Sequence, residues 1–578
     1  MAKVLNGIAT SDGFAIACAY KLSAPSFSIS SDKIRPKDVS KEIETAENAL
    51  KLAIEQLEVI KLNAAAKLGE YQASIFQAHI EILNDPTIVE DIRQSIKNDF
   101  NNALYAVNHV FDATYERFIN MQDSYFRERS ADISDIKNRV LSILSNFEMP
   151  NLLALEKSVI IVADDLTPSQ TSLLDKNYVK GFVTTTGGKT SHAAIIARTL
   201  EIPAVLGISN LMEEIQNGEM IAIDGTKGTI QYNLTQNEIE KLKSDEIVSA
   251  VDGSVNEYLD KKAITTDGQE FVVCANIGKI ADMDSAIKNG SAGVGLFRTE
   301  FLYMGSRTWP TEDEQFSAYK EVVEKAKGEL VIIRTLDIGG DKNLPYHKFE
   351  YELNPFLGHR AVRFCLANPN VLKTQLRAIL RAAAFGKVGI MFPMVATIDE
   401  LKKLKDFLSY CEMELKLENT KTGKPLIGIM VEIPATALQA EVFAKQVDFF
   451  SIGTNDLIQY AFAADRMSKT VNYLYQPLNP AILRLIKFTV DGANKANIWV
   501  GMCGEMASDL MAIPLLVGLN IKEFSMVPSS ITKVKKIICQ LNQSSCATLV
   551  EQALTCQTDE EVAKLVEEFC KTNNISLR

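Results

Sequence analysis

Eight apolar runs recur through the second half of the chain, and segments with helical spacing separate most of them. A near-continuous apolar strand that alternates with helices is typical of a parallel sheet whose faces are covered. Eight such units in succession predict a (β/α)₈ barrel of the TIM type over residues 263–578. The predicted strands are the runs 270–278, 292–300, 330–337, 388–395, 426–434, 449–456, 498–505 and 523–528.

The first half of the chain has a different texture. Residues 1–33 and 147–235 contain short strand-like runs, such as FAIACAYKL and SVIIVADDL, and are expected to form one α/β domain. Between them, residues 34–146 are rich in Ala, Leu, Ile, Glu and Lys at helical spacing, which predicts a helical bundle inserted into that domain. Residues 236–262 are polar and charged, and they predict a helical linker to the barrel.

The net charge and the cysteines exclude several classes of protein. The chain has 578 residues, a formal net charge of -12 and nine cysteines without CxxC spacing. Such an acidic chain is not expected to bind nucleic acid, and scattered cysteines favour a reducing cytoplasm over a disulfide framework or a zinc site. No apolar run is long enough to span a bilayer, and Gly and Asp interrupt the N-terminus before a signal-peptide core. We therefore expect a soluble cytoplasmic protein without membrane insertion.

Charged and polar side chains stand at the C-terminal ends of the predicted barrel strands, where the active sites of such barrels lie. Several arginines together suit a phosphate and a carboxylate held by bidentate hydrogen bonds. Glu432 and Asp456, on neighbouring strand ends, could hold Mg²⁺, which prefers oxygen ligands and shares them with substrate phosphate. The alternative is that these groups form only salt bridges that close the barrel top. The strand-end residues are Asn276, Arg298, Glu300, Arg334, Asp337, Glu432, Asn455, Asp456, Cys503 and Glu505, with Arg360 and Arg466 in the segments after the third and sixth strands.

The stretch TTTGGKTSHAAIIAR (184–198) looks like a phosphate-binding loop that runs into a helix. A Walker A loop requires glycine at the position that Val183 occupies, so the nucleotide-binding interpretation fails on spacing. The stretch instead predicts a strand, a tight turn and a helix capped by Thr190 or Ser191. His192 then lies in the first helical turn, where the helix dipole and free N–H groups would stabilise a phosphoryl group on its ring.

The two halves of the chain combine into one hypothesis of mechanism. A small phosphorylated carboxylic acid binds with Mg²⁺ in the barrel mouth, and the neutral imidazole of His192 takes its phosphoryl group as a nucleophile. If the donor is an enol phosphate, the product enolate must be protonated at carbon. Cys503, at the end of the seventh strand, is the candidate acid.

Several motifs resemble those of enzyme I of the bacterial phosphoenolpyruvate-dependent sugar phosphotransferase system. GGKTSHAAIIAR is similar to the phosphohistidine signature of phosphoenolpyruvate-utilising enzymes, and DFFSIGTNDLIQYAFAADR to their second signature. FRTEFLY, RTLDIGGDK, NPFLGHRAVR and GMCGEMA also match. The resemblance covers essentially the whole chain in the family's domain order. It implies an α/β phosphohistidine domain with an inserted helical bundle, followed by the (β/α)₈ barrel.

The resemblance also implies roles for individual residues. His192 would be the phosphorylated residue, with Thr190 close to its ring, and Cys503 would be the proton donor. Glu432 and Asp456 would hold Mg²⁺. The phosphoenolpyruvate site would comprise Arg298, Arg334, Arg360, Asn455, Asp456 and Arg466.

The partners follow from the same resemblance. The inserted bundle would dock the histidine-containing carrier protein HPr through the region GEYQASIFQAHIEILND, with Glu70, His79 and Ile82 as contacts. Tyr71 and Glu81 depart from the family pattern there, which could tune the choice of carrier. The family further implies phosphoenolpyruvate and pyruvate as small-molecule partners and a homodimer formed through the barrel domain.

Two alternative functions remain to be weighed. Pyruvate phosphate dikinase and phosphoenolpyruvate synthase share both signatures, but they need a large nucleotide-binding domain ahead of the histidine, and only about 190 residues precede His192 here. A non-catalytic signalling relative is disfavoured because the histidine, the arginines, the carboxylates and Cys503 are all present. The helical block alone would also fit a structural bundle or a coiled-coil dimer.

Overall fold

The computed structural model describes residues 3–577 apart from 12, 23–26, 69, 121–129, 148–151, 153–154, 172, 188–192, 195–196, 198–201, 241, 243–256, 305, 307, 341, 343, 345, 348, 467 and 469. The chain divides into two compact units, residues 1–251 and 252–578. Each unit is built around its own hydrophobic cores. Much of the predicted linker 236–262 lies outside the described residues.

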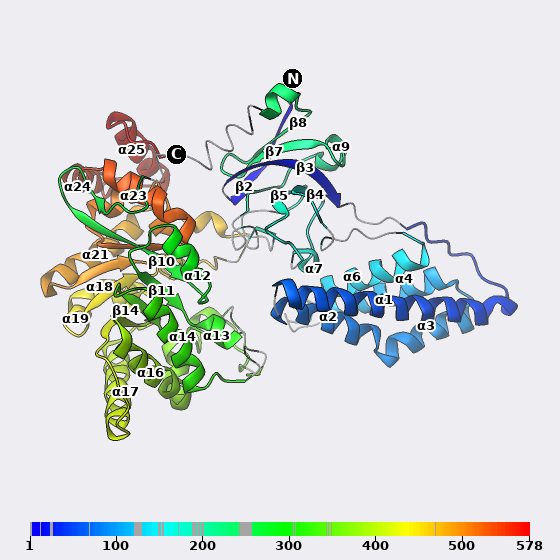
Figure 1. Cartoon of the computed structure of the whole chain (residues 1–578), viewed down its shortest axis with the longest axis horizontal. Helices are drawn as coiled ribbons and strands as arrows, with labels where there is room; N and C mark the ends of the chain where they lie inside the picture. The colour runs from blue at the N-terminus through cyan, green and yellow to red at the C-terminus, as the bar shows by residue number, and fades with distance from the viewer. Residues whose placement is uncertain are drawn as a thin grey trace. The chain divides into compact units, whose positions relative to one another are not determined.

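A mixed eight-stranded sheet forms one part of the first unit (Figure 1). Its strand order is β1-β8-β7-β3-β4-β5-β6-β2; β3 to β6 run parallel and the other neighbours antiparallel. Alternate apolar residues of the central strands supply two separate cores. The elements are β1 (Lys3–Asn6), β2 (Ile8–Ser11), β3 (Phe14–Leu22), β4 (Val159–Ala163), α7 (Pro168–Thr171), β5 (Val179–Thr184), β6 (Ala204–Leu206), α9 (Leu211–Glu214), β7 (Met220–Asp224) and β8 (Thr229–Tyr232).

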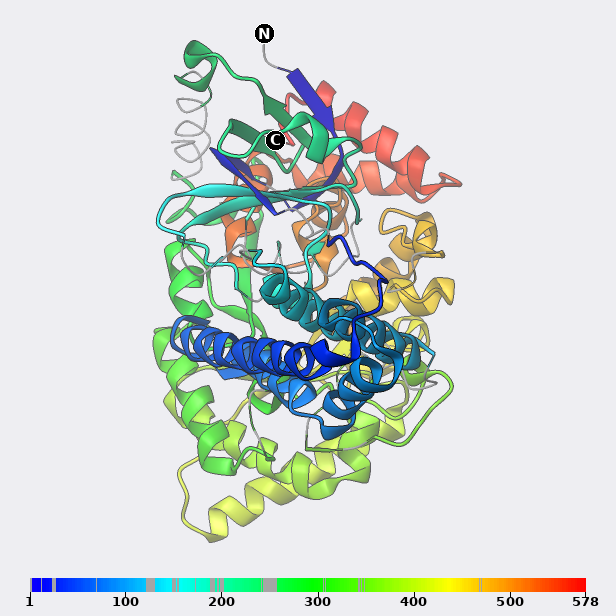
Figure 2. The ribbon, with the colours of Figure 1, turned by 90° about the vertical axis from the view of Figure 1, so that its right-hand side faces the viewer.

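A helical bundle occupies the chain between β3 and β4. The first two helices of the bundle run side by side (Figures 1 and 2). Their buried residues, such as Leu50 and Phe76, share one core with Phe111 and Val140. Asp85 caps the third helix, because its carboxylate accepts a hydrogen bond from the Thr87 N–H at 2.8 Å. The helices are α1 (Val39–Leu68), α2 (Glu70–Leu83), α3 (Pro86–Asp99), α4 (Ala103–Ile119) and α6 (Ser130–Leu144).

Eight parallel strands close into a barrel in the second unit, since the first of them, β10, pairs with both β11 and β17. The short antiparallel strand β9 (Ala263–Ile264) extends β10 at one edge. The barrel strands are β10 (Glu270–Ile277), β11 (Val294–Arg298), β12 (Val331–Arg334), β13 (Val388–Phe392), β14 (Leu426–Val431), β15 (Phe449–Ile452), β16 (Trp499–Met502) and β17 (Glu523–Met526).

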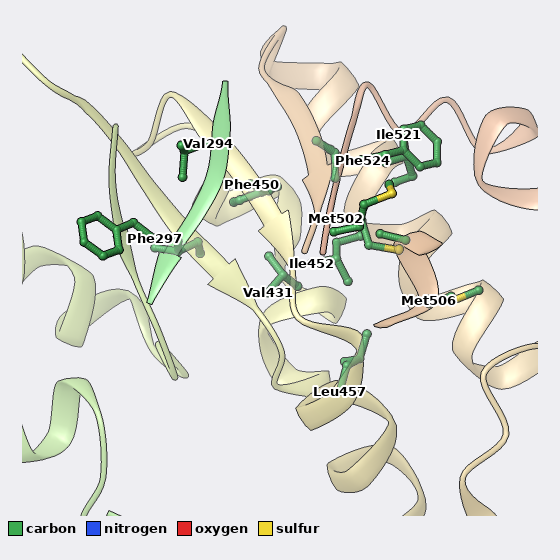
Figure 3. Packing of buried hydrophobic residues seen from close by; sticks show 14 of the residues in the cluster. Val294, Phe297, Val431, Phe450, Ile452, Leu457, Met502, Met506, Ile521 and Phe524 are labelled. Atoms are coloured by element: carbon green, nitrogen blue, oxygen red, sulfur yellow. The ribbon is translucent and has the colours of Figure 1, made fainter. Parts of the chain in front are cut away.

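Helices follow the barrel strands and cover the outside of the barrel. Strand residues such as Phe450, Ile452, Met502 and Phe524 point outward into this layer, where they join one large core (Figure 3). The helices are α12 (Asp282–Lys288), α13 (Glu300–Met304), α14 (Glu312–Lys325), α15 (Val362–Ala367), α16 (Pro369–Ala382), α17 (Ile398–Leu417), α18 (Pro434–Leu438), α19 (Ala440–Ala444), α20 (Thr454–Phe462), α21 (Pro480–Ala496), α22 (Ile513–Gly518), α23 (Ile531–Gln540), α24 (Gln543–Ala553) and α25 (Asp559–Thr572).

The predicted fold class is confirmed. All eight barrel runs form strands, and the strand-like and helical runs of the first half form the sheet and the bundle. The short strands β6 and β9 were not predicted, because three and two residues are too few for a hydrophobic period to show. The domain boundaries within residues 1–251 stay a prediction. None of the described helices combines the length and apolar character that crossing a membrane requires.

A large aromatic ring fills much of the barrel interior, where small residues make room for it. The Phe449 ring stacks on Trp499 with centroids 4.8 Å apart and an interplanar angle of 7°. It also joins an inner cluster with Ile332 and Met430. A Cβ atom added to Gly428 would collide with the ring, whereas one added to Gly389 would lie 3.3 Å from it.

We predict that Gly428→Ala lowers the free energy of unfolding of the barrel by about 1–3 kcal/mol, the usual cost of overpacking a core. Gly389→Ala should lower it less, because Gly389 faces the same ring with more room. Urea unfolding followed by tryptophan fluorescence measures this, because both tryptophans, Trp309 and Trp499, belong to the barrel unit. Equal stability of Gly428→Ala and the unmodified chain would contradict the packing.

Candidate active site

A buried carboxylate, Asp337, holds two arginines together at the C-terminal end of the barrel. Asp337 follows β12 and accepts hydrogen bonds from Arg360 Nη2 at 2.9 Å (Oδ1) and 3.1 Å (Oδ2). Arg334 Nη1 lies 3.2 Å and Lys342 Nζ 3.5 Å from its Oδ2. Burial alone would raise the pKa of Asp337, but these three cations together lower it. Asp337 is therefore ionised and shares one negative charge among three positive groups.

Arg334 retains an unused donor although it is buried. Its Nη2 lies 3.1 Å from the Glu300 carboxylate, and its Nη1 faces Asp337. Its Nε–H has no hydrogen-bond partner within the described part of the chain. A buried N–H without a partner is costly, so this donor indicates a ligand.

Arg298 lies beside Arg334, because the two residues are register partners on β11 and β12. Its side chain is exposed to solvent, although protein groups surround it closely enough that burial and then the like charge of Arg334 lower its pKa. No carboxylate pairs with Arg298 among the described residues. Two neighbouring guanidinium groups with spare donors form a seat for an anion such as a phosphate.

The fully buried Arg360 connects this anion seat to the neighbouring strand end. Its Nη1 donates to Asp456 Oδ1 at 3.3 Å and to the Tyr460 hydroxyl at 3.2 Å. Arg466 Nη1 lies 3.8 Å from the other oxygen of Asp456. Asp456 occupies the first turn of α20, so the helix following β15 carries one carboxylate toward two arginines. Tyr460 lies one helical turn further on.

Glu432 supplies a second carboxylate, directly after β14. Its side chain is buried, and its Oε1 accepts a hydrogen bond from the Met394 N–H at 2.6 Å. Burial, followed by the negative charges of Asp456 and Asp337, raises the pKa of Glu432 to about 8. A cation bound beside Glu432 would lower this pKa, because its positive charge would offset the negative charges of the neighbouring carboxylates.

The two carboxylates fit a divalent cation with oxygen ligands, because the Oε2 of Glu432 accepts no hydrogen bond from the described residues. The described ranges contain no cluster of three or more His, Cys, Asp or Glu side chains that would enclose a metal. A cation that binds through one or two carboxylates and completes its shell with water and substrate oxygens suits such a pair.

Cys503 lies in the barrel interior below the anion seat. The side chain is 3% exposed, and its Sγ–H faces the Ile452 carbonyl oxygen at 3.8 Å. Burial raises the pKa of the thiol to about 11, although the Ser451 hydroxyl and Arg334 lower it. The thiol is therefore protonated at neutral pH. Asn276 supports it, since its Nδ2 donates to the Cys503 carbonyl oxygen at 3.1 Å.

The Asn455 side chain lies at the rim of the site. Its Oδ1 accepts a hydrogen bond from the Glu505 N–H at 3.0 Å, and its Nδ2 donates to the Glu505 carboxylate at 3.4 Å. Tyr475 Oη donates to Asn455 Oδ1 at 3.4 Å. These contacts fix the amide beside Asp456.

The histidine loop is only partly described. His192 and its neighbour Thr190 lie outside the described residues. Before them, Gly187 has φ 102°, a conformation that favours glycine at a turn. After them, Ala193, Ala194 and Ala197 are helical and buried in the core of the sheet. The strand β5 and these buried helical residues therefore lie on either side of His192 in the sequence, and the predicted helix start at Thr190 or Ser191 falls outside the described residues.

The three residues expected at the carrier surface are placed differently from one another. His79 is 2% exposed, and its Nε2 lies 3.4 Å from Asp132, so its side chain belongs to the core of the bundle and does not face a partner. Ile82 is half-buried and packs on the same core. Glu70 begins α2, and its side chain lies outside those described.

The barrel end thus brings the predicted arginines, carboxylates, Asn455 and Cys503 into one connected site. The sequence did not reveal that Asp337 and Glu300 are the counter-charges of Arg334, nor that Lys342 and Tyr460 join the site. Tyr460 follows Asp456 by four residues on a helix, which is the spacing that could have revealed it.

Comparison with known proteins identifies three domains of phosphoenolpyruvate-utilising enzymes in the chain. Residues 253–543 match the family model of the "PEP-utilising enzyme, PEP-binding domain", residues 6–129 that of the "PEP-utilising enzyme, N-terminal", and residues 155–228 that of the "PEP-utilising enzyme, mobile domain".

Three similar relatives are each named phosphoenolpyruvate-protein phosphotransferase. The protein of Mycoplasma genitalium is 48% identical over 577 residues, which cover 99% of this chain and 100% of the relative. The protein of Mycoplasma pneumoniae is 49% identical over 574 residues, with coverage of 99% and 100%. The protein of Listeria monocytogenes is 48% identical over 573 residues, with coverage of 98% and 100%. The resemblance stated from the motifs is confirmed, and the chain belongs to the phosphoenolpyruvate-protein phosphotransferase family.

Proposed function

We propose that this chain takes the phosphoryl group of phosphoenolpyruvate onto His192 and passes it to a histidine of the carrier protein HPr, releasing pyruvate. This would be the first step of sugar uptake by a phosphotransferase system. Transfer from phosphoenolpyruvate to protein is the activity of the family. The observation that carries the assignment of the site is the pair of Arg334, with its unused Nε–H, and Arg298, which has no carboxylate partner among the described residues.

The arginine pair would bind the phosphate of phosphoenolpyruvate. Two guanidinium groups offer several parallel N–H donors, and phosphate oxygens accept them bidentately. The net positive charge at this position is preserved because Asp337 is already shared with Arg360 and Lys342. Arg466 and Asn455, on the far side of Asp456, would complete the substrate site.

Glu432 and Asp456 would hold Mg²⁺. When bound, the cation supplies charge neutralisation for the phosphate and for the enolate that forms as the phosphoryl group leaves. The Glu432 carboxylate accepts a hydrogen bond from the Met394 N–H, and the Asp456 carboxylate accepts one from Arg360.

The chemistry would then proceed in two proton-balanced steps. The neutral imidazole of His192 attacks phosphorus, so that an N–P bond forms while the bond between phosphorus and the enol oxygen breaks. The enolate left in the barrel takes a proton at carbon from the Cys503 thiol, which is protonated at neutral pH, and pyruvate leaves. Thr190 would position the ring of His192.

The assembly around this chemistry is also part of the proposal. HPr would dock on the inserted helical bundle, a homodimer would form through the barrel, and the protein would act in the cytoplasm. These assignments rest on the family resemblance. The burial of His79 moves the expected docking surface to its exposed neighbours on α2, such as Glu81.

We expect phosphorus label from phosphoenolpyruvate to appear on the protein in the presence of Mg²⁺ in an acid-labile, base-stable form, as phosphohistidine requires. His192→Ala should abolish the label. His109→Ala, which removes an exposed histidine of α4, is the matched control and should keep it. Label that persists in His192→Ala would refute the assignment of the nucleophile.

We expect Arg298 and Arg360 to respond differently to loss of charge. Arg298→Met should prevent labelling while the free energy of unfolding stays within about 0.5 kcal/mol of that of the unmodified chain. The substitution leaves no carboxylate without its partner, because none of the described carboxylates pairs with Arg298. Arg360→Met should destabilise the barrel by about 3–5 kcal/mol, because it leaves buried Asp337 without its bidentate partner. Labelling assays and urea unfolding of both variants measure this. Normal labelling of Arg298→Met would contradict the proposed anion seat.

A further inference from the structure

The ends of β11 and β12 carry two arginines of like charge side by side. Arg298 and Arg334 are register partners, and two guanidinium groups repel each other when no anion lies between them. The register of the two strands shifts between Val294 and Phe297, so the backbone ladder is irregular just before the arginines. An irregular ladder fixes strand ends less firmly than a regular one, so side chains have to hold the arginines together.

Thr299, the residue after Arg298, joins the two strand ends by its side chain. The side chain is completely buried, and its Oγ1–H donates a hydrogen bond to the Arg334 carbonyl oxygen at 2.9 Å. The next residue, Glu300, adds a second link, because its carboxylate accepts a hydrogen bond from the Asp337 N–H at 3.0 Å. The end of β11 is thus tied to the end of β12 by two neighbouring side chains.

Gln375 of α16 holds this link from outside the barrel strands. Its side chain is completely buried, its Oε1 accepts a hydrogen bond from the Leu336 N–H at 2.8 Å, and its Nε2 donates to Thr299 Oγ1 at 3.0 Å. A backbone N–H can only donate, so the oxygen of the amide must face Leu336 and its nitrogen must face Thr299. One amide therefore contacts the residue after β11 and a residue just after β12.

The remaining N–H of Gln375 ties the amide to α14. It donates to the Tyr319 hydroxyl at 3.2 Å, and this hydroxyl donates to Gln315 Oε1 at 3.0 Å. Gln315 in turn donates from Nε2 to the Pro310 carbonyl oxygen at 3.0 Å. The helices α14 and α16 pack against each other beside the barrel (Figure 1). The amide of Gln375 therefore cannot turn away from the strand ends without breaking three buried hydrogen bonds.

We propose that Gln375 is a positioning residue for the anion seat. Through Thr299 and Leu336 it holds the two strand ends, and with them the two arginines, at the spacing that binds a phosphate. This rests on the proposed function, in which the arginine pair binds the phosphate of phosphoenolpyruvate. Binding groups work at full strength only when they are held within about 0.5 Å of the productive geometry. Without these hydrogen bonds, the repulsion between the arginines would move the strand ends apart.

Equilibrium binding of phosphoenolpyruvate tests this role. The full chain with His192→Ala cannot take up the phosphoryl group, so calorimetric titration with phosphoenolpyruvate and Mg²⁺ measures binding alone. The titration gives the dissociation constant and the fraction of chains that bind. In this background, Gln375→Met removes three hydrogen bonds with little change of side-chain volume and should raise the dissociation constant about tenfold. A merely unstable barrel would lower the binding fraction and keep the constant.

Gln315→Met is the matched control. Gln315 is a buried glutamine of the same network with three hydrogen bonds of its own, and its partners Tyr303, Tyr319 and Pro310 belong to neither strand end. Its substitution should lower the free energy of unfolding by an amount similar to that for Gln375→Met. The dissociation constant should stay within a factor of about two of the value for the background chain.

Two substitutions at Thr299 test the same link separately and decide the question if Gln375→Met does not fold. Thr299→Val keeps the β-branched shape and removes the hydroxyl that joins Gln375 to the Arg334 carbonyl group, so the dissociation constant should rise about tenfold. Thr299→Ser keeps the hydroxyl and should restore the binding of the background chain.

Three outcomes would speak against these assignments. An unchanged dissociation constant in Gln375→Met and Thr299→Val would overturn the positioning role. An equal rise in Gln315→Met would also overturn it, because the effect would then belong to the whole network of hydrogen bonds. Tight binding of phosphoenolpyruvate to a chain that keeps His192 but never becomes labelled would instead refute the proposed function.

Discussion

The shared carboxylate of Asp337 is the interaction on which the rest of the site depends. One buried negative charge lies between Arg334, Arg360 and Lys342, in a place where unpaired charge is costly. Glu300 and Asp456 are further counter-charges of Arg334 and Arg360. The positive excess therefore rests on Arg298, which pairs with no carboxylate among the described residues, beside the unused Nε–H of Arg334. Arg360 also donates a hydrogen bond to Asp456 at 3.3 Å, so the same arginine links Asp337 to the strand end that carries Asp456. A phosphate and a divalent cation would therefore complete the charge balance of the barrel end.

The barrel interior is filled by apolar side chains on one side and contains polar side chains on the other. On one side, Phe449 and its aliphatic neighbours fill the space at the density of a core, and the glycines beside the ring leave room for it. On the other side, Gly295 and Gly501 leave room for the polar groups around Glu523. The glycines thus decide where an aromatic ring fills the barrel interior and where polar side chains lie.

The sequence predicted the barrel because eight buried parallel strands produce eight apolar runs that alternate with helical segments. It also predicted Arg298, Arg334, Glu432, Asp456 and Cys503, because strand ends converge on one side of a barrel. It could not predict which charges pair, since Asp337 and Arg360 are 23 residues apart and meet only through the loop that follows β12.

We infer that the Arg298 and Arg334 pair is an anion seat left open by the sharing of Asp337. A crystal structure of the chain with phosphoenolpyruvate and Mg²⁺ tests it most directly. We expect phosphate oxygens within hydrogen-bond distance of Arg298 and of the Arg334 Nε, with the cation between Glu432 and Asp456. Phosphate bound elsewhere, with the Arg334 Nε still without a partner, would contradict the account.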